Sequence, residues 1–458
     1  MKTNTRLSYA STTHEGGAAD PHQKPITELE RAVATCLLWE DTFYEKGSDL
    51  AARIATLCQE VSAEALAALA VKARTEWKLR HVPLWLVRQM VRLHKGRVVG
   101  DAIAAVVQRP DEAAELVSLY WRDGRKMLPK QMKRGLGLAF RRWDEYRLAK
   151  WDRAKAIKLR DVLFLARPKP KDAEQDALWK RLIAGTLATP DTWENALSSG
   201  ADPRETWERL LRERTLGYMA LLQNLRNMEQ AGGDRALIDG ALLAGAEKSW
   251  ALHFRFIMSA KHAPPFAQAL SDAMVASVSG LERLPGSTHF VVDVSGSMEY
   301  ALSAPEVQAT AYYQARVHGT DPTTKSRLDA AGALAVLLRE VCATARVFTF
   351  SNRLVEVANL RGLALCSAIV TSQEHGATHL KAALDTLRAK IPTADRVLVI
   401  TDEQSQDGIA AAWAPRSYLL NVAPYKPGLD VHHGWVRING WSERVVDWLR
   451  WHETADAR

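Results

Sequence analysis

The sequence predicts a multi-domain protein, in which an array of short α-helices is followed by a doubly wound α/β domain. Amphipathic helical patterns without strand signals begin at Ile26 and continue almost to Leu284. From His289 onward, strand and helix patterns alternate, which is typical of a parallel sheet covered by helices. The apolar strand Phe290–Val292 ends in the polar motif Asp293-Val-Ser-Gly-Ser297, and open α/β sheets bind ligands at this end of their strands.

Three segments follow from these patterns. Residues 1–25 are polar and without periodicity, and we expect a mobile N-terminal tail. Residues 26–285 form the helical domain, and residues 286–458 form the α/β domain. The stretch Leu284-Pro-Gly-Ser287 between the two domains is a short, turn-like link.

Capping signals and apolar faces mark the helices. The box Thr27-x-x-Glu30 starts the first one, and amphipathic runs follow at 51–61, 63–73, 84–93, 102–107 and 113–121. A capping residue followed by proline predicts two more helix starts, at Thr189-Pro190 and Asp202-Pro203, and Gly200 fits the end of the first of these helices. Paired short helices in succession predict a HEAT-type solenoid, with a compact helical bundle as the alternative.

The α/β domain shows a similar sequence of local signals. Strands are expected at 290–292, 345–350, 397–400 and 417–422, and helices at 331–342, 380–390 and 443–451.

Three loops of this domain carry residues with hard oxygen ligands. Asp293, Ser295 and Ser297 follow one strand, Thr378 precedes a helix, and Asp402 ends the strand that starts at Arg396. Such oxygens suit a magnesium ion that keeps several waters. Together the five residues resemble the metal-ion-dependent adhesion site of a von Willebrand factor A domain, which implies a divalent metal, Mg²⁺ or Mn²⁺. The alternative, in which the serines only cap a helix, leaves Thr378 and Asp402 unexplained.

A phosphatase of the haloacid dehalogenase type is a rival interpretation of the same strand. It would use Asp293 as the nucleophile and would need a second aspartate two residues later, where this chain has Ser295. A serine-hydrolase elbow is also absent from the sequence here, because Val294 and not glycine precedes Ser295. We therefore expect a protein that is not an enzyme.

Composition limits the cellular setting. The four cysteines are far apart and form no CxxC pair, which predicts neither a zinc site nor a disulfide framework. The N-terminus lacks the apolar core of a secretory signal, and no apolar run of about 18 residues predicts a membrane span. We expect a cytoplasmic protein with no membrane partner.

Positive charge is concentrated in one segment. Residues 122–171 contain 17 Lys or Arg and 5 Asp or Glu, a net charge of +12, whereas the rest of the chain has a net charge of −4. This predicts a polyanionic partner, most simply a nucleic acid. Trp143, Tyr146 and Trp151 lie among the cations and are candidates for base stacking, with a solvated helix face over core aromatics as the alternative.

The helical domain resembles the TROVE module of the Ro ribonucleoprotein family. The resemblance is carried by Leu128-Pro-Lys-Gln-Met-Lys-Arg-Gly135, by Arg147-Leu-Ala-Lys150, and by the stretch from Leu159 to Pro170. It continues in Thr192-Trp-Glu194, in the stretch from Met219 to Met228, and in Leu252-His-Phe-Arg-Phe256. The order of the domains, TROVE before von Willebrand A, is also that of the family.

This resemblance implies a ring of HEAT-like helices and a scaffold or chaperone in RNA quality control. The expected partners are small Y-type non-coding RNA, single-stranded ends of misfolded RNA, and an exoribonuclease tethered through RNA. Lys150 falls on a basic position of the family. A second basic position falls on Ala154, between Arg153 and Lys155, and the family's histidine is replaced by Arg167.

The candidate RNA-binding residues are the cations of this segment that share helix faces or match the family. They are Lys130, Lys133, Arg134, Arg141, Arg142, Lys150, Arg153, Lys155, Lys158, Arg160 and Arg167. A metal-dependent protein-interaction module on a helical scaffold is the alternative function.

Overall fold

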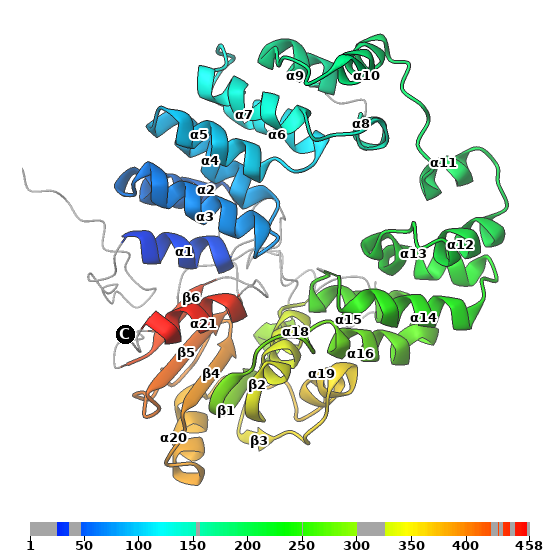
Figure 1. Ribbon diagram of the computed structural model, residues 1–458. Coiled ribbons are helices and arrows are strands. Elements are labelled where there is room, and N and C mark those ends of the chain that lie inside the picture. The colour runs from blue at the N-terminus through cyan, green and yellow to red at the C-terminus, as the bar shows by residue number, and fades with distance from the viewer. Residues whose placement is uncertain are drawn as a thin grey trace, which may run out of the picture. The chain divides into compact units, whose positions relative to one another are not determined.

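The computed structural model describes residues 25–35, 47–152, 156–249, 251–299, 326–422, 429, 434–439 and 445–455 (Figure 1). The predicted tail, apart from Pro25, lies outside these residues. The chain divides into two compact units. We call Pro25–Trp39 with Ser48–Leu216 the helical unit, and the unit that contains Gly217–Arg458 the mixed unit.

The helical unit is built from short helices that follow one another closely. They are α1 (Pro25–Thr35), α2 (Gly47–Leu57), α3 (Ala63–Thr75), α4 (His81–Leu93), α5 (Arg97–Val106), α6 (Pro110–Trp121), α7 (Lys130–Phe140), α8 (Glu145–Trp151), α9 (Leu159–Ala166), α10 (Ala173–Ala184), α11 (Trp193–Ser198) and α12 (Pro203–Arg212). Packing between α3 and α4, α3 and α5, α4 and α6, α5 and α7, and α7 and α9 joins near neighbours in the sequence. This neighbour-on-neighbour order confirms the helical-repeat array.

Several predicted helices end within two residues of the observed ends, but the predicted start at the Thr27 capping box was wrong, because α1 already begins at Pro25. Asp202 caps α12 and Pro203 is its first residue, as predicted. The helix expected from Pro190 was placed wrongly, because α11 begins at Trp193 with Thr192 as its cap. Thr192 Oγ1 accepts a hydrogen bond from the Asn195 N–H. This cap fixes the start of α11, although Pro190 also favours a helix start three residues earlier. Gly200 adopts a φ of 86° just past the end of α11.

Helix α7, which carries part of the basic segment, lies very close to α5. A Cβ atom on Gly135 of α7 would lie 2.6 Å from Ile103 Cβ and 2.7 Å from the Gly100 carbonyl oxygen, both on α5. Only glycine permits this approach, so α7 lies directly against α5.

The mixed unit combines four helices with a sheet and its covering helices. They are α13 (Tyr218–Gln230), α14 (Arg235–Ala246), α15 (His253–His262), α16 (Ala267–Ala276), β1 (Leu284–Asp293), α18 (Arg327–Glu340), β2 (Cys342–Phe350), β3 (Leu354–Glu356), α19 (Gly362–Val370), α20 (Leu380–Lys390), β4 (Arg396–Thr401), β5 (Arg416–Asn421), β6 (Val436–Asn439) and α21 (Val445–Ala455). The short elements β3, β6 and α19 had no clear sequence signal. Strand order is β3-β2-β1-β4-β5-β6, parallel except for the β2–β3 pair.

Helices cover both faces of the sheet, as a doubly wound domain requires. Leu384 and Leu387 of α20 pack in one cluster with Val291, Phe348 and Val399 of the strands. On the other face α18 contacts β1, β2 and β4, and α21 contributes Trp448 to an edge contact with Tyr418. Figure 1 shows α20 apart from α18 and α21. The predicted α/β class is confirmed.

The helices before the sheet pack against its covering helices α18 and α19, within the same unit. Lys261 of α15 pairs with Asp329 of α18 at 2.7 Å, and the Leu363 N–H donates to Ser271 Oγ of α16 at 3.1 Å. The predicted link also has a different role, because β1 already begins at Leu284, which pairs with Cys342 of β2. The register shifts between Leu284 and Ser287, where Gly286 has a φ of 83°.

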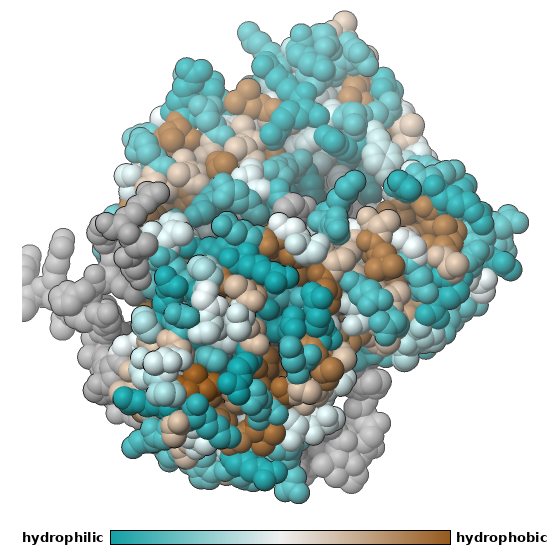
Figure 2. Space-filling model, turned by 60° about the horizontal axis from the view of Figure 1, so that its bottom comes forward, coloured by the Kyte–Doolittle hydropathy of each residue, from teal (hydrophilic) through white to brown (hydrophobic). Residues whose placement is uncertain are grey.

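The surface view adds the distribution of polarity. In Figure 2, hydrophilic residues cover most of the visible face, and hydrophobic residues form several separate patches. Within the part of the chain that the structure describes, every helix is too short or too polar to cross a bilayer.

Candidate metal site and nucleic-acid interface

The sheet topology brings the two predicted acids together. Strand β1 lies between β2 and β4, and the strands that follow β1 in the sequence are added on both of its sides. The order of the strands therefore reverses at β1, and open α/β sheets bind ligands at such a switch point. Val292 pairs with Ile400, which sets Asp293 beside Thr401 and one residue from Asp402. Thr401 Oγ1 donates to Asp293 Oδ2 at 2.6 Å, and both carboxylates are fully buried.

Hydrogen bonds between loops add the predicted Thr378. The Gly296 N–H donates to the Gly376 carbonyl at 3.2 Å, and His375 Nδ1 donates to the Val294 carbonyl at 2.6 Å. The Thr378 carbonyl in turn accepts from the Gln406 N–H at 2.9 Å, which ties it to the loop after Asp402. All three loops therefore meet at one edge of the sheet.

The serines complete an acid–hydroxyl cluster, which we define as Asp293, Ser295, Ser297, Thr378 and Asp402. Ser295 Oγ and Ser297 Oγ lie 3.2 Å apart, and the Ser295 N–H donates to Asp293 Oδ1 at 2.9 Å. Two carboxylates and three hydroxyls are hard oxygen donors that fit Mg²⁺ or Mn²⁺. Among the described residues, no group of three or more His, Cys, Asp or Glu side chains is placed to hold a metal, so hydroxyl donors would be essential here.

An arginine that the sequence patterns did not single out lies in this cluster. Arg327, the first residue of α18, is 1% exposed, and its Nη1 donates to Asp402 Oδ2 at 2.9 Å and to the Ser297 carbonyl at 3.2 Å. Burial and the nearby Asp402 carboxylate raise the pKa of Asp293 to about 7. The guanidinium thus supplies positive charge next to two buried acids, and it occupies a carboxylate oxygen that a directly bound metal would use.

The residue after Asp402 is conformationally unusual. Glu403 has a φ of 61°, and its buried carboxylate accepts from Arg437 Nη2 at 3.0 Å and from the Leu429 N–H at 3.1 Å. These bonds hold Glu403 in a left-handed conformation that residues other than glycine rarely adopt. The turn that presents Asp402 depends on this conformation.

The predicted RNA-binding cations of the helical unit differ in their environment. Arg134 pairs with Asp101 at 2.8 Å, and Arg141 Nε donates to the Lys169 carbonyl at 3.0 Å. Arg142 Nη2 donates to the carbonyls of Ala104 and Val107 at 2.5 and 2.7 Å, at the end of α5. These three arginines therefore have structural partners within the protein.

The other cations are more available. No ion pair within 4 Å is found, across the described part of the chain, for Lys130, Lys133, Lys158 and Arg167. Arg160 has a long contact of 4.0 Å with Asp161, and Arg153 and Lys155 lie outside the described residues. The available cations come from α7 and from both ends of α9, two helices that pack together.

Trp143 and Trp151, two of the aromatic side chains predicted to stack on bases, already pack against other groups of the protein. Trp143 is 2% exposed, its Nε1 donates to the Gln108 carbonyl at 2.9 Å, and it packs edge-on against Phe140, so its predicted role in base stacking was wrong. The Arg109 guanidinium lies 3.6 Å from the centre of the Trp151 ring. Tyr146 is 45% exposed, and sequence analysis missed Phe164, which is 56% exposed.

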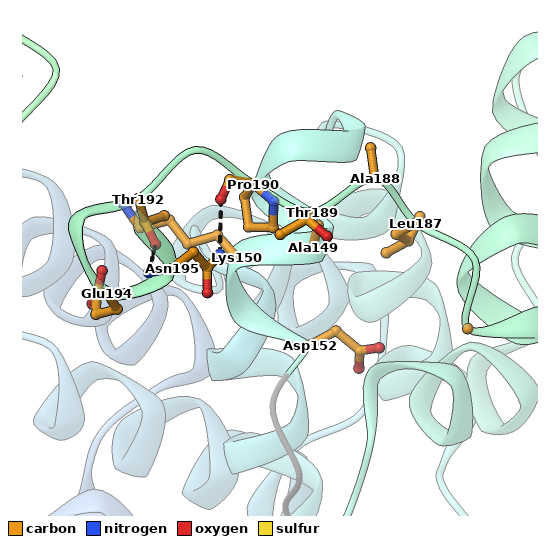
Figure 3. Close-up of a pocket in the computed structure, with 11 residues that line it drawn as sticks. Ala149, Lys150, Asp152, Leu187, Ala188, Thr189, Pro190, Thr192, Glu194 and Asn195 are labelled. Carbon is orange, nitrogen blue, oxygen red and sulfur yellow. Dashed lines mark hydrogen bonds between the residues drawn. The ribbon is translucent and has the colours of Figure 1, made fainter. Parts of the chain in front are cut away.

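Lys150 lines a cavity of about 570 Å³ (Figure 3). The opposite wall is the connection between α10 and α11 together with the start of α11, where Asn195 Nδ2 donates to the Pro190 carbonyl at 2.8 Å. Asp152 and Glu194 also line the cavity, so its charge is mixed. Lys150 Nζ lies 3.4 Å from Tyr146 Oη, which leaves the amine beside an exposed aromatic ring.

A helical-repeat array and a doubly wound domain with an acid–hydroxyl edge define the class, namely helical-repeat proteins with a von Willebrand A-like domain. The TROVE domain family model matches residues 175–235, from α10 into α14. The crystal structure of the Ro (RSR) protein of Deinococcus radiodurans matches with a TM-score of 0.62 at 15% identity, covering 93% of this chain and 98% of that one. The chain therefore has the fold of that Ro protein, and part of its helical region matches the TROVE domain family.

Two other comparisons are less informative. No curated protein matches the sequence. An aerotolerance-related membrane protein from Bacteroides fragilis matches with a TM-score of 0.20 at 19% identity over 30% of this chain and 67% of that one, too weakly to inform the fold.

Proposed function

We propose that this protein is a non-catalytic RNA-binding protein of the Ro type. The observation that carries the proposal is the set of cations on α7 and α9 that have no ion-pair partner among the described residues, in a segment with a net charge of +12. Phosphate oxygens are the ligands that such cations bind, and the bound counterions that they release favour association. The TROVE match over residues 175–235 supports RNA over DNA as the polyanion.

The finer assignment rests on the family resemblance. We propose small Y-type non-coding RNA and single-stranded ends of misfolded RNA as ligands. The protein would then act in the cytoplasm as a scaffold or chaperone in RNA quality control, with an exoribonuclease tethered through the RNA. Crosslinking followed by sequencing of the bound RNA tests this assignment, and recovery of no small structured RNA would contradict it.

Salt dependence tests the basic surface directly. Replacing Lys130, Lys133 and Lys158 by Ala should weaken binding of a structured RNA and flatten the plot of log affinity against log salt, by roughly 0.7–0.9 per lost phosphate contact. Electrophoretic mobility shifts at several salt concentrations measure both quantities.

A matched control keeps the charge change constant. Lys381, Arg388 and Lys390 are exposed on α20 of the mixed unit, so their replacement by Ala removes the same three charges elsewhere. We expect this control to bind RNA with nearly the wild-type slope. If both triple variants behave alike, binding depends on net charge only, and the assigned surface is wrong.

We also propose that the acid–hydroxyl cluster binds Mg²⁺ or Mn²⁺. Asp293 and Asp402 would provide negative charge, the three hydroxyls would provide neutral oxygen donors, and the metal would polarise a ligand at an open position. This site favours a second candidate function, metal-dependent binding of a carboxylate from a partner protein. A protein that binds Mn²⁺ but shows no salt-dependent RNA binding would support the second candidate over the first.

A further inference from the structure

A second cavity, of about 350 Å³, lies between α9, α10 and the loop that joins them. Its walls are mainly apolar, formed by Leu163, Phe164, Pro168 and Ile183 together with Trp179. Trp179 is only 4% exposed and packs edge-on against Phe140, so this wall is fixed by the core of the helical unit.

The cavity wall carries an unsatisfied donor. The indole Nε1–H of Trp179 is buried and has no hydrogen-bond acceptor among the described residues. A buried N–H group without a partner is destabilising, and structures generally retain such a group where a ligand or water completes the bond. An acceptor atom of a ligand that reached Nε1 would satisfy this donor.

The rim supplies an aromatic surface and positive charge. Phe164 is 56% exposed although its neighbours on α9, Leu163 and Val162, are buried. Arg167 lines the cavity and has no ion-pair partner within 4 Å in the described ranges, whereas Lys180 is neutralised by Asp176 at 2.7 Å. The loop Arg167-Pro-Lys-Pro-Lys171 adds Lys169 on a backbone that its prolines stiffen, whereas Lys171 lies 3.7 Å from Asp172.

We propose that this cavity is a subsite for a single unpaired nucleobase. A nucleobase has a flat ring that can stack on Phe164 and carbonyl or ring-nitrogen acceptors that can bind the Trp179 N–H. The phosphate of the same nucleotide can pair with Arg167. A lipid tail or an apolar peptide side chain lacks the acceptor and the negative charge. The inference rests on the proposed RNA-binding function and identifies the part of the RNA that this region recognises.

The test measures how much one base contributes to the affinity, separately from the sugar–phosphate backbone. The two probes are an abasic ribose-phosphate oligomer and the same oligomer with one central uridine, so that both have equal charge. The wild type should prefer the uridine probe on the order of ten-fold, because stacking of one base on an aromatic side chain contributes about that much. Fluorescence anisotropy at fixed low salt measures both affinities.

Three variants test which side chain causes the preference for the uridine probe. Phe164→Ala should bind the two probes equally, at the wild-type affinity for the abasic probe, and it should remain folded because Phe164 is exposed. Trp179→Phe keeps the ring but removes the donor, and should lose part of the preference. Leu93→Ala, at a position 41% exposed on α4, is the matched control and should keep the full preference.

The outcomes separate the subsite from the proposed function. A wild type that binds both probes equally, with the salt dependence of phosphate contacts, overturns the nucleobase subsite and leaves RNA binding intact. A wild type that binds neither these probes nor a structured RNA overturns the proposed function itself. A preference that survives in Phe164→Ala shows that the base binds elsewhere and also overturns the subsite.

Discussion

Arg327 and Asp402 form a buried ion pair at the edge of the sheet, beside a second buried acid. Their side chains are 1% and 0% exposed, and Asp293 is joined to the same cluster through Thr401. Two like charges in a buried site require a counter-charge. Arg327 can supply it without a metal, so we expect a divalent ion to bind Asp402 directly only when the guanidinium is displaced.

Replacing Arg327 by Met should therefore have two linked effects. In the presence of a chelator, the free energy of unfolding should fall by about 3–5 kcal/mol, the usual cost of leaving one partner of a buried pair alone. Excess Mn²⁺ should restore much of this stability and should bind the variant more tightly than the wild type. Urea denaturation with and without Mn²⁺, and calorimetric titration, measure the two effects.

Two controls define the result. Arg346 pairs with Glu356 at 2.8 Å with both side chains 45% exposed, so Arg346→Met should change the free energy of unfolding by less than about 1 kcal/mol. Asp293→Asn removes a carboxylate that we propose as a metal ligand, and it should give no Mn²⁺ heat. If Arg327→Met also gives no heat beyond that of Asp293→Asn, the cluster is a structural ion pair and not a metal site.

At the scale of elements, the basic surface depends on how closely α7 lies against α5. Gly135 lets the two helices meet, and it shares α7 with Lys130 and Lys133. Arg142, just after α7, caps carbonyls at the end of α5. The cations that have no ion pair within the described ranges are thus presented by helices that other cations, Arg142 among them, hold in place.

Alanine substitutions at two helical glycines should have opposite signs. Gly135→Ala brings a Cβ to 2.6 Å from Ile103 and should lower the free energy of unfolding by about 1–3 kcal/mol, because α5 and α7 must separate. Gly240→Ala on α14 meets nothing within 4 Å and should raise it by about 0.5–1 kcal/mol through helix propensity. Thermal and urea unfolding compare the two. Equal effects would show that the α5–α7 contact is less tight than described.

At the scale of the whole molecule, charge and aromatic surface are unevenly distributed. The net charge of +12 belongs to residues 122–171, and the remainder is slightly acidic. The exposed Tyr146 and Phe164 lie within the same segment. A surface of this composition binds phosphates of any RNA, but it stacks only on bases that are not paired, because bases within an A-form duplex are stacked on each other.

A structured RNA with an unpaired 3′ tail should therefore bind better than the same RNA with a blunt end. We expect at least about ten-fold tighter binding of the tailed hairpin, since about 1–3 kcal/mol is gained for each stacked base. Competition between the two hairpins at fixed salt measures the difference. Equal competition would restrict binding to phosphate contacts, and the basic surface alone would remain.

The sequence by itself determined which residue types stand at the ends of strands and helices. Asp293, Thr378 and Asp402 were found because strand ends and turns carry local signals, and Asp202 was identified as a cap for the same reason. Their convergence followed from the α/β alternation, since parallel strands end at one edge.

Only the tertiary structure decided which charged and aromatic side chains are free to bind a ligand. Arg327 meets Asp402 across 75 residues of sequence, and Trp143 meets the Gln108 carbonyl across 35. Hydrogen-bond partners at such separations leave no periodic trace in the chain, so a basic helix face appears uniform in the sequence. Packing divides it into arginines that hold the fold and other cations, Arg167 among them, that remain available, because each buried polar group must find a partner wherever the fold brings one.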